Sequence, residues 1–328
     1  MSLNNIKAVI YSCEGCVLSE EERSFFHEAQ PLGFILFGRN CDNPEQLYAL
    51  TSSLREAVGW DCPILIDQEG GRVQRLKPPL WRGFPAMQSF GEQAAGDMDA
   101  ALDDLRYTVL QLSEELLSAG VNVNCAPVMD VLTPITHDVI GDRAFSYDPD
   151  IVARLGLSAC RHFLAAGVVP IVKHIPGHGR ANVDSHKDLP RVSASLQELR
   201  LFDFKPFQEI AASDIGAQVW AMAAHIVYES IDADLPSSAS PRVINDIIRG
   251  DIGFDGLLVS DDLDMDALSL LGDVAQRSVA VLNAGCDVAL YCSGKLEDMQ
   301  SIAKVVPNLT EKARKSLQNS LKALQMTV

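Results

Sequence analysis

Eight short apolar segments recur along this chain, and a longer segment separates each from the next. The apolar segments are rich in β-branched residues, which is typical of strands buried on both faces of a parallel sheet. The predicted strands are 7–12, 33–38, 63–67, 121–126, 169–174, 219–225, 256–260 and 287–292. This alternation constrains the fold more than any other feature of the sequence.

The longer segments have the periodicity of amphipathic helices. Pro44 stands where the first turn of a helix tolerates proline, and Gly120 and Gly167 stand where helices commonly end. Eight strand–helix alternations predict an α/β fold of the (β/α)8 TIM-barrel type. A doubly wound dinucleotide-binding sheet would need G-x-G-x-x-G after a strand, and the sequence has none. Without a linker-like segment, we predict one (β/α)8 barrel domain over 1–328 with a closing helix at its C-terminal end.

Charge and composition restrict the partners of the chain. Asp and Glu number 44 against 27 Lys and Arg, a net charge of −17, which disfavours nucleic acid and anionic membranes as partners. The N-terminal sequence "MSLNNIKAVI" lacks a secretory pattern, and no apolar segment is long enough to span a membrane. We therefore expect a cytoplasmic protein. The CxxC pair Cys13 and Cys16 has no second pair, so we interpret its spacing as coincidence.

Ionisable residues follow several predicted strands at their C-terminal ends. Asp67 ends the third strand, Lys173 and His174 end the fifth, and Asp261 and Asp262 follow the seventh. Active sites of such barrels form at this end, so we predict a site there.

The segment "KHIPGHGRANVDSHKDLP" at 173–190 raises the question of a metal or a proton-transfer site. His174, His178, His186 and His225, with Asp184, could supply ligands. However, the chain lacks H-E-x-x-H, and proline and glycine separate the first two histidines, so the spacing is not that of a metal site. We predict no metal.

The alternative is proton transfer, which the "DSH" triplet favours. In an extended segment Asp184 and His186 project to the same side, and a carboxylate beside an imidazole makes it a competent acid and base. On strand seven, we predict that a helix begins near Leu263 with Asp262 as its N-cap. Asp261 is then the candidate nucleophile. The competing interpretation of this acidic cluster is an ordinary charged helix start.

An ordered set of motifs resembles a known family. "DQEGGRVQR", "IGDRAF", "KHIPGHG" with "DSH", and "DGLLVSDDLDM" together resemble the β-N-acetylglucosaminidases of glycoside hydrolase family 3, particularly their single-domain bacterial members. The resemblance implies a retaining exo-β-N-acetylglucosaminidase (a β-N-acetylhexosaminidase) that acts on cell-wall muropeptides in peptidoglycan recycling. It implies neither a metal nor an organic cofactor, and we expect a monomer with a carbohydrate as its small-molecule partner.

The resemblance also implies residue roles. Asp261 would form a covalent glycosyl-enzyme, and His186 would be the general acid and base with Asp184 as its partner. The implied sugar-binding residues are Asp67, Arg75, Arg143, Lys173 and His174.

Two other functions remain open from the sequence. A histidine acid/base carries no negative charge to repel phosphate, so a phosphorylase is one alternative. A non-catalytic sugar-binding barrel is the other. We also predict that the 175–189 loop is flexible, because Gly177 and Gly179 flank His178 and the loop is long for a barrel connection.

Overall fold

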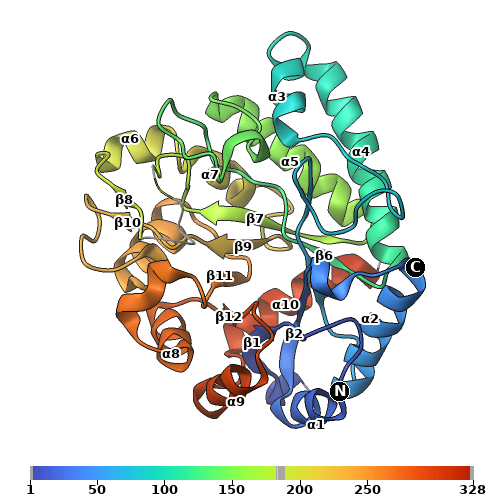
Figure 1. Cartoon of the computed structure of the whole chain (residues 1–328). Helices are drawn as coiled ribbons and strands as arrows, with labels where there is room; N and C mark the ends of the chain where they lie inside the picture. Colours follow the sequence, from blue (N-terminus) through green and yellow to red (C-terminus); the bar gives the residue numbers. More distant parts are fainter. Residues whose placement is uncertain (1–2, 182, 184–188, 326–328) are drawn as a thin grey trace.

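Eight parallel strands close into a barrel in the computed structural model, which describes residues 3–181, 183 and 189–325 (Figure 1). They are β1 (Lys7–Tyr11), β2 (Pro31–Leu36), β3 (Ile64–Ile66), β6 (Val123–Asn124), β7 (Val169–Ile175), β9 (Trp220–Ala223), β11 (Leu258–Asp262) and β12 (Val288–Leu290). Each strand pairs with the next in chain order, and β12 pairs with β1 through Val9–Ala289 and Ile10–Leu290. The eight predicted strands and the (β/α)8 TIM-barrel prediction are confirmed.

Burial explains why the strands carry so few polar residues. Every residue of β2, β3, β7, β9 and β12 is buried, since the barrel interior covers one face and the helices cover the other. Two small additional sheets lie outside the barrel. They are the antiparallel pair β4 (Gln68–Gly70) with β5 (Val73–Gln74), and the parallel pair β8 (Arg191–Val192) with β10 (Val227–Tyr228).

Helices surround the barrel (Figure 1). The α-helices are α1 (Glu20–Ala29), α2 (Pro44–Val58), α3 (Met87–Ala94), α4 (Met98–Ser118), α5 (Pro149–Ala165), α6 (Leu196–Leu201), α7 (Lys205–Ala212), α8 (Val274–Ala284), α9 (Leu296–Val305) and α10 (Glu311–Gln325). The other helical segments are the 3-10 helices η1 (Leu3–Asn5), η2 (Gly38–Asn40), η3 (Gly141–Arg143), η4 (Ser237–Ala239) and η6 (Asp266–Leu271), and the π-helix η5 (Val243–Asp251). Pro44 is the first residue of α2, as predicted, and Asn43 caps it by accepting a hydrogen bond from the Gln46 N–H.

The predicted helix after β11 is wrong in its start and its cap. β11 extends through Asp262, and no helix begins at Leu263. The Asp262 side chain instead accepts hydrogen bonds from the backbone N–H groups of Asp264 and Cys292, so it ties β11 to the segment after β12. The chain forms η6 and then α8, which are separated at Gly272 with φ of 95°. Long-range hydrogen bonding thus replaced the local capping expected from sequence.

Helix α10 packs on the N-terminal side of the barrel. The indole N–H of Trp220, at the start of β9, donates to the Ser320 hydroxyl at 2.8 Å. The helix therefore lies opposite the strand ends at which ionisable residues gather. That residues 1–328 form one domain stays a prediction.

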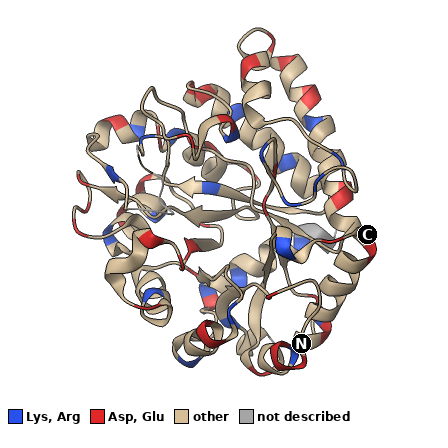
Figure 2. Cartoon of the chain, viewed as in Figure 1, with Lys and Arg blue, Asp and Glu red and all other residues tan. Residues whose placement is uncertain are grey.

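Acidic and basic residues are distributed over the outer helices and loops (Figure 2). Within the described part of the chain, no helix is both long and apolar enough to cross a membrane.

Candidate active site

A cavity of about 270 Å³ opens at the C-terminal ends of the strands. Its acidic and basic lining residues are Asp67, Glu69, Arg72, Arg75, Arg143, Lys173, His174, Asp261 and Asp262. Six of the eight predicted site residues lie in this set. The other two, Asp184 and His186, lie outside the described residues. Charged groups from five different strand ends and loops therefore meet in one small space.

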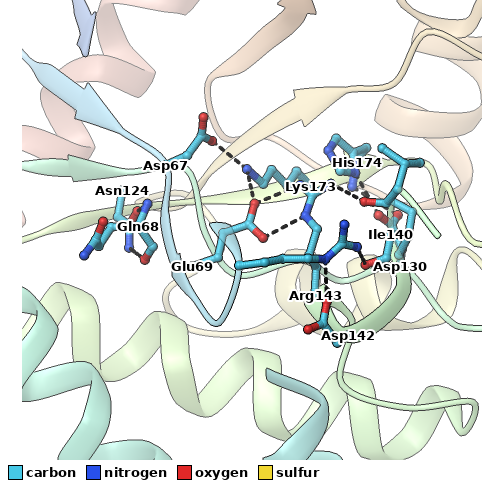
Figure 3. A network of polar contacts seen from close by, with 12 residues as sticks. Asp67, Gln68, Glu69, Asn124, Asp130, Ile140, Asp142, Arg143, Lys173 and His174 are labelled. Atoms are coloured by element: carbon cyan, nitrogen blue, oxygen red, sulfur yellow. Dashed lines mark hydrogen bonds and ion pairs between the residues drawn. The ribbon is translucent and has the colours of Figure 1, made fainter. Parts of the chain in front are cut away.

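Lys173 is the centre of a buried ion-pair network (Figure 3). Its Nζ lies 2.8 Å from Asp67 Oδ1 and 2.7 Å from Glu69 Oε1. Asp67 Oδ2 also accepts a hydrogen bond of 2.8 Å from Arg75 Nη2. Glu69 receives a bidentate pair from Arg143, with Nε and Nη2 both at 2.8 Å. These two carboxylates thus hold the three cationic side chains close together.

The network sets the charge of its members. Burial opposes ionisation of Asp67 and Glu69, but the nearby cations outweigh it and hold the pKa of both carboxyl groups below the usual range. In turn these carboxylates raise the pKa of Lys173, against the effect of its burial. The cavity wall therefore presents fixed charged donors at neutral pH.

The "DQEGGRVQR" motif folds back as the β4–β5 hairpin. Gly70 and Gly71 have φ of 97° and 56°, a left-handed turn that other residues rarely adopt. The Gln68 side chain accepts hydrogen bonds from the backbone N–H groups of Arg75 and Leu76. This closed hairpin places Asp67, Glu69 and Arg75 on the cavity side although Arg75 lies eight positions after Asp67.

Asp130 is a fully buried residue to which the sequence analysis assigned no role. Its Oδ2 lies 2.7 Å from His174 Nδ1, and its Oδ1 accepts from the backbone N–H groups of His174 at 3.1 Å and His178 at 2.6 Å. Burial opposes ionisation of Asp130, but His174 and the hydrogen bonds hold its pKa below the usual range. An ionised acceptor requires the hydrogen on His174 Nδ1, which leaves Nε2 for a ligand.

The first part of the predicted flexible loop is hydrogen-bonded to segments that lie around the barrel. Tyr228 donates its hydroxyl hydrogen to the Gly177 carbonyl, and Arg180 Nε donates to Asp203 at 2.7 Å. A Cβ on Gly179 would lie 1.8 Å from the Val131 carbonyl oxygen, so this glycine permits close packing. Within residues 175–181 the glycines therefore allow neighbouring backbone segments to approach closely. The mobility of the loop stays a prediction.

Asp261 and Asp262 end β11 side by side at the cavity. Asp261 Oδ1 accepts a hydrogen bond of 2.8 Å from the Asp262 backbone N–H. Loss of hydration raises the pKa of Asp262 to about 6. Burial lowers the pKa of His225, whose ring contacts the Ser238 hydroxyl and the Asp262 carbonyl. The predicted nucleophile thus lies beside the carboxyl group of Asp262 and the neutral imidazole of His225.

The raised pKa of Asp262 predicts a pH-dependent stability. An unfolded aspartate has a pKa near 3.9, so the folded state binds more protons between about pH 4 and pH 6, and the wild type loses stability as pH rises through that window. Asp262→Asn removes this loss and retains the side-chain acceptor oxygen. We expect the free energy of unfolding of the variant to exceed that of the wild type by about 1 kcal/mol at pH 7.5, after allowing for solvent screening. At pH 4 the two values should be equal.

Urea unfolding at pH 4, 5, 6 and 7.5 measures the difference. Asp255→Asn, at a side chain 83% exposed, is the control and should show no such trend. A difference between Asp262→Asn and the wild type that does not change with pH would contradict the assignment.

Metal ligation finds no support in the described part of the chain. There, no group of three or more histidine, cysteine, aspartate or glutamate side chains is arranged to hold an ion. Cys13 and Cys16 are free thiols.

Comparison with known proteins identifies the family. A family model described as the glycosyl hydrolase family 3 N terminal domain matches residues 4–325. The chain belongs to glycosyl hydrolase family 3. The resemblance found in the sequence is thereby confirmed, and the chain is a glycoside hydrolase of the β-hexosaminidase type.

Individual members of family 3 agree in sequence and fold. A β-hexosaminidase of Bordetella avium (strain 197N) is 35% identical over 285 residues, which cover 87% of this chain and 80% of that protein. One from Xanthomonas oryzae pv. oryzae (strain MAFF 311018) is 38% identical over 88% of this chain and 85% of its own length. NagZ from Neisseria gonorrhoeae, solved in complex with N-trifluoroacetyl-D-glucosamine, superposes with a TM-score of 0.87 at 31% identity, over 98% of this chain and 92% of that chain.

Proposed function

We propose that this family 3 enzyme is a retaining exo-β-N-acetylglucosaminidase that removes non-reducing terminal N-acetylglucosamine from cell-wall muropeptides during peptidoglycan recycling. One observation carries the proposal. The carboxylate of Asp261 lies in the same small cavity as the charged network around Lys173, so a nucleophile faces groups suited to hold one sugar.

The network supports recognition of a single terminal sugar. Arg75, Arg143 and Lys173 are donors and Asp67 is an acceptor, which suits hydroxyl and acetamido oxygens. His174 adds Nε2, because its Nδ1 is engaged by Asp130. The N-trifluoroacetyl-D-glucosamine bound to the Neisseria protein supports an N-acylated glucosamine ligand here.

The proposed mechanism is a double displacement through Asp261. His186 donates a proton to the glycosidic oxygen while the Asp261 carboxylate attacks the anomeric carbon, so the aglycone leaves as an alcohol and a glycosyl-aspartate forms. His186, oriented by Asp184, then takes a proton from water, whose oxygen attacks the same carbon and releases Asp261. Two inversions give overall retention. The usual scheme uses a second carboxylate as acid and base, and here a histidine takes that role.

The physiological setting is part of the same proposal. The family resemblance to single-domain bacterial members supports muropeptide substrates, a monomeric state and a cytoplasmic location.

Hydrolysis of 4-nitrophenyl N-acetyl-β-D-glucosaminide tests the activity. We expect release of 4-nitrophenol that EDTA leaves unchanged, because the chemistry proceeds through side chains. Proton NMR of the first product should show the β-anomer, as two inversions require. Added inorganic phosphate should produce no sugar phosphate. Activity lost in EDTA, an α-anomer first, or a sugar 1-phosphate as the main product would each overturn the proposed mechanism.

A matched pair of natural glycosides tests the substrate class. Muropeptides with a terminal N-acetylglucosamine should be cleaved with a higher kcat/KM than N,N′-diacetylchitobiose, which carries the same terminal sugar. A clear preference for the chitin disaccharide would argue against the muropeptide assignment.

A further inference from the structure

We propose that Glu69 is a positioning residue that holds Lys173 and Arg143 side by side, so that their remaining hydrogens face the bound sugar. This inference rests on the proposed function, because it assigns a task within the same sugar site. No role was predicted for Glu69 from the sequence, although the residue lies within the "DQEGGRVQR" motif.

Both carboxylate oxygens of Glu69 contact the two cations. Oε1 receives Lys173 Nζ at 2.7 Å and Arg143 Nη2 at 2.8 Å, and Oε2 receives Arg143 Nε at 2.8 Å. The side chain is 1% exposed. A carboxylate with three charge-assisted contacts acts through its neighbours, because little of its acceptor capacity is left for a ligand.

Glu69 joins three segments that are distant in the sequence. Glu69 lies on β4, Lys173 on β7 and Arg143 on η3, and Figure 3 shows the two cations converging on the carboxylate. Arg143 uses Nε and one Nη2 hydrogen on Glu69, and Nη1 donates to the Val139 carbonyl at 2.9 Å. Lys173 uses two of its three hydrogens on Asp67 and Glu69. The hydrogens left over are those available to a sugar oxygen.

Charge explains why a single carboxylate would not suffice. Asp67 already pairs with Arg75 and Lys173. Without Glu69, three cations would therefore share one carboxylate in a space largely closed to water. Lys173 and Arg143 would then repel each other, and the lysine would lose its proton at a lower pH.

A direct catalytic role for Glu69 is disfavoured by the same contacts. Burial alone would favour the protonated acid, but Arg143 and Lys173 hold the pKa of Glu69 below its usual range, so the group stays ionised. A permanently ionised carboxylate whose oxygens face two cations is a poor proton donor and a hindered nucleophile.

Steady-state kinetics of Glu69→Gln and Glu69→Asp form the first test. We expect kcat/KM of Glu69→Gln to fall on the order of 100-fold, because misplacement of binding groups has effects of this size. Glu69→Asp keeps the charge and should recover part of the rate. Glu114→Gln, the same change at an exposed residue of α4, should leave kcat/KM unchanged.

Trace acetylation of Lys173 with acetic anhydride, quantified by mass spectrometry, is a second test that requires no catalysis. Relative to the half-exposed Lys312, Lys173 in Glu69→Gln should acetylate at pH 9 at least tenfold faster than in the wild type, since each unit of pKa changes the free amine tenfold. Glu69→Asp should stay near the wild type.

The outcomes separate the two proposals. A wild type without glycosidase activity would overturn the proposed function, whereas the acetylation rates would still decide the role of Glu69. Unchanged kcat/KM and acetylation in Glu69→Gln would overturn the positioning role. If Glu69→Gln fails to fold, Glu69→Asp decides the question: a partly reduced kcat/KM with wild-type acetylation is expected, and a Lys173 that acetylates rapidly despite the retained charge would overturn it.

Discussion

Asp261→Ala should lower kcat for 4-nitrophenyl N-acetyl-β-D-glucosaminide by about 10⁴-fold or more, because loss of a covalent nucleophile leaves only binding and acid catalysis. The Asp261 side chain accepts a hydrogen bond from the N–H of the adjacent Asp262, a contact between chain neighbours, so the fold should persist. Thermal unfolding of the variant and steady-state rates for both proteins measure the two effects.

Chemical rescue of the variant by a small anion distinguishes a nucleophilic aspartate from one that only supports the structure. Sodium azide should restore turnover to Asp261→Ala and yield an α-glycosyl azide, because a small anion enters the space of the lost carboxylate and inverts the anomeric carbon once. Asp255→Ala, an exposed aspartate before β11, should keep the wild-type rate and gain nothing from azide. Retention of more than a few per cent of activity in Asp261→Ala without azide would refute the covalent role.

Asp130→Ala should destabilise the enzyme by about 3–5 kcal/mol, the largest stability effect that we expect from a single substitution. It removes a fully buried acceptor from the backbone N–H groups of His174 and His178 and from the His174 ring, and each unsatisfied group costs about 1–3 kcal/mol. Urea unfolding at pH 7 checks the value. Asp61→Ala, at a side chain 86% exposed, should change stability by less than about 0.5 kcal/mol.

Asp130→Asn tests the role of this residue in function. The amide oxygen can still accept from the backbone, but the amide nitrogen now faces His174 Nδ1 and favours the other tautomer, with the hydrogen on Nε2. We expect kcat/KM to fall about 100-fold with a stability loss of only about 1 kcal/mol. Parallel losses of rate and stability in both variants would indicate that Asp130 only supports the fold.

The stability contribution of Asp130 should also depend on pH. Its folded pKa lies below the unfolded value near 3.9, so the contribution is present above that value and is lost as pH falls through the folded pKa. The gap between wild type and Asp130→Ala should therefore be constant from pH 7 to pH 5 and should narrow below about pH 4. A gap that widens in acid would contradict the ionised state.

The barrel could be predicted because its strands are buried on both faces. That burial requires apolar, β-branched segments, and their number and alternation with helices are local features that any reader of the sequence can count. The segment after β11 could not be predicted in the same way. Asp262 looks like an N-cap from its neighbours alone, but the structure engages it with the Cys292 N–H, 30 positions further along the chain.

The candidate site was predicted in outline for a similar reason. Asp67, Lys173, His174 and Asp261 lie at or next to the C-terminal ends of strands, and all strands of a parallel barrel end at the same rim. Glu69 and Asp130 were missed because their tasks are contacts to other side chains. Their only signal was an acidic residue within a few positions of a strand end, which is common on protein surfaces.

By itself, then, the sequence determined the barrel, the family and the rim at which the candidate site lies, because these depend on hydrophobic periodicity and on motifs formed by neighbouring residues. Only the tertiary structure decided which charges neutralise one another. Glu69 pairs with residues 74 and 104 positions away, and Asp130 with a histidine 44 positions away. Such pairs follow from the closure of the barrel, since ion-pair energies depend on distance in space and on burial, and neither quantity is written in the order of residues.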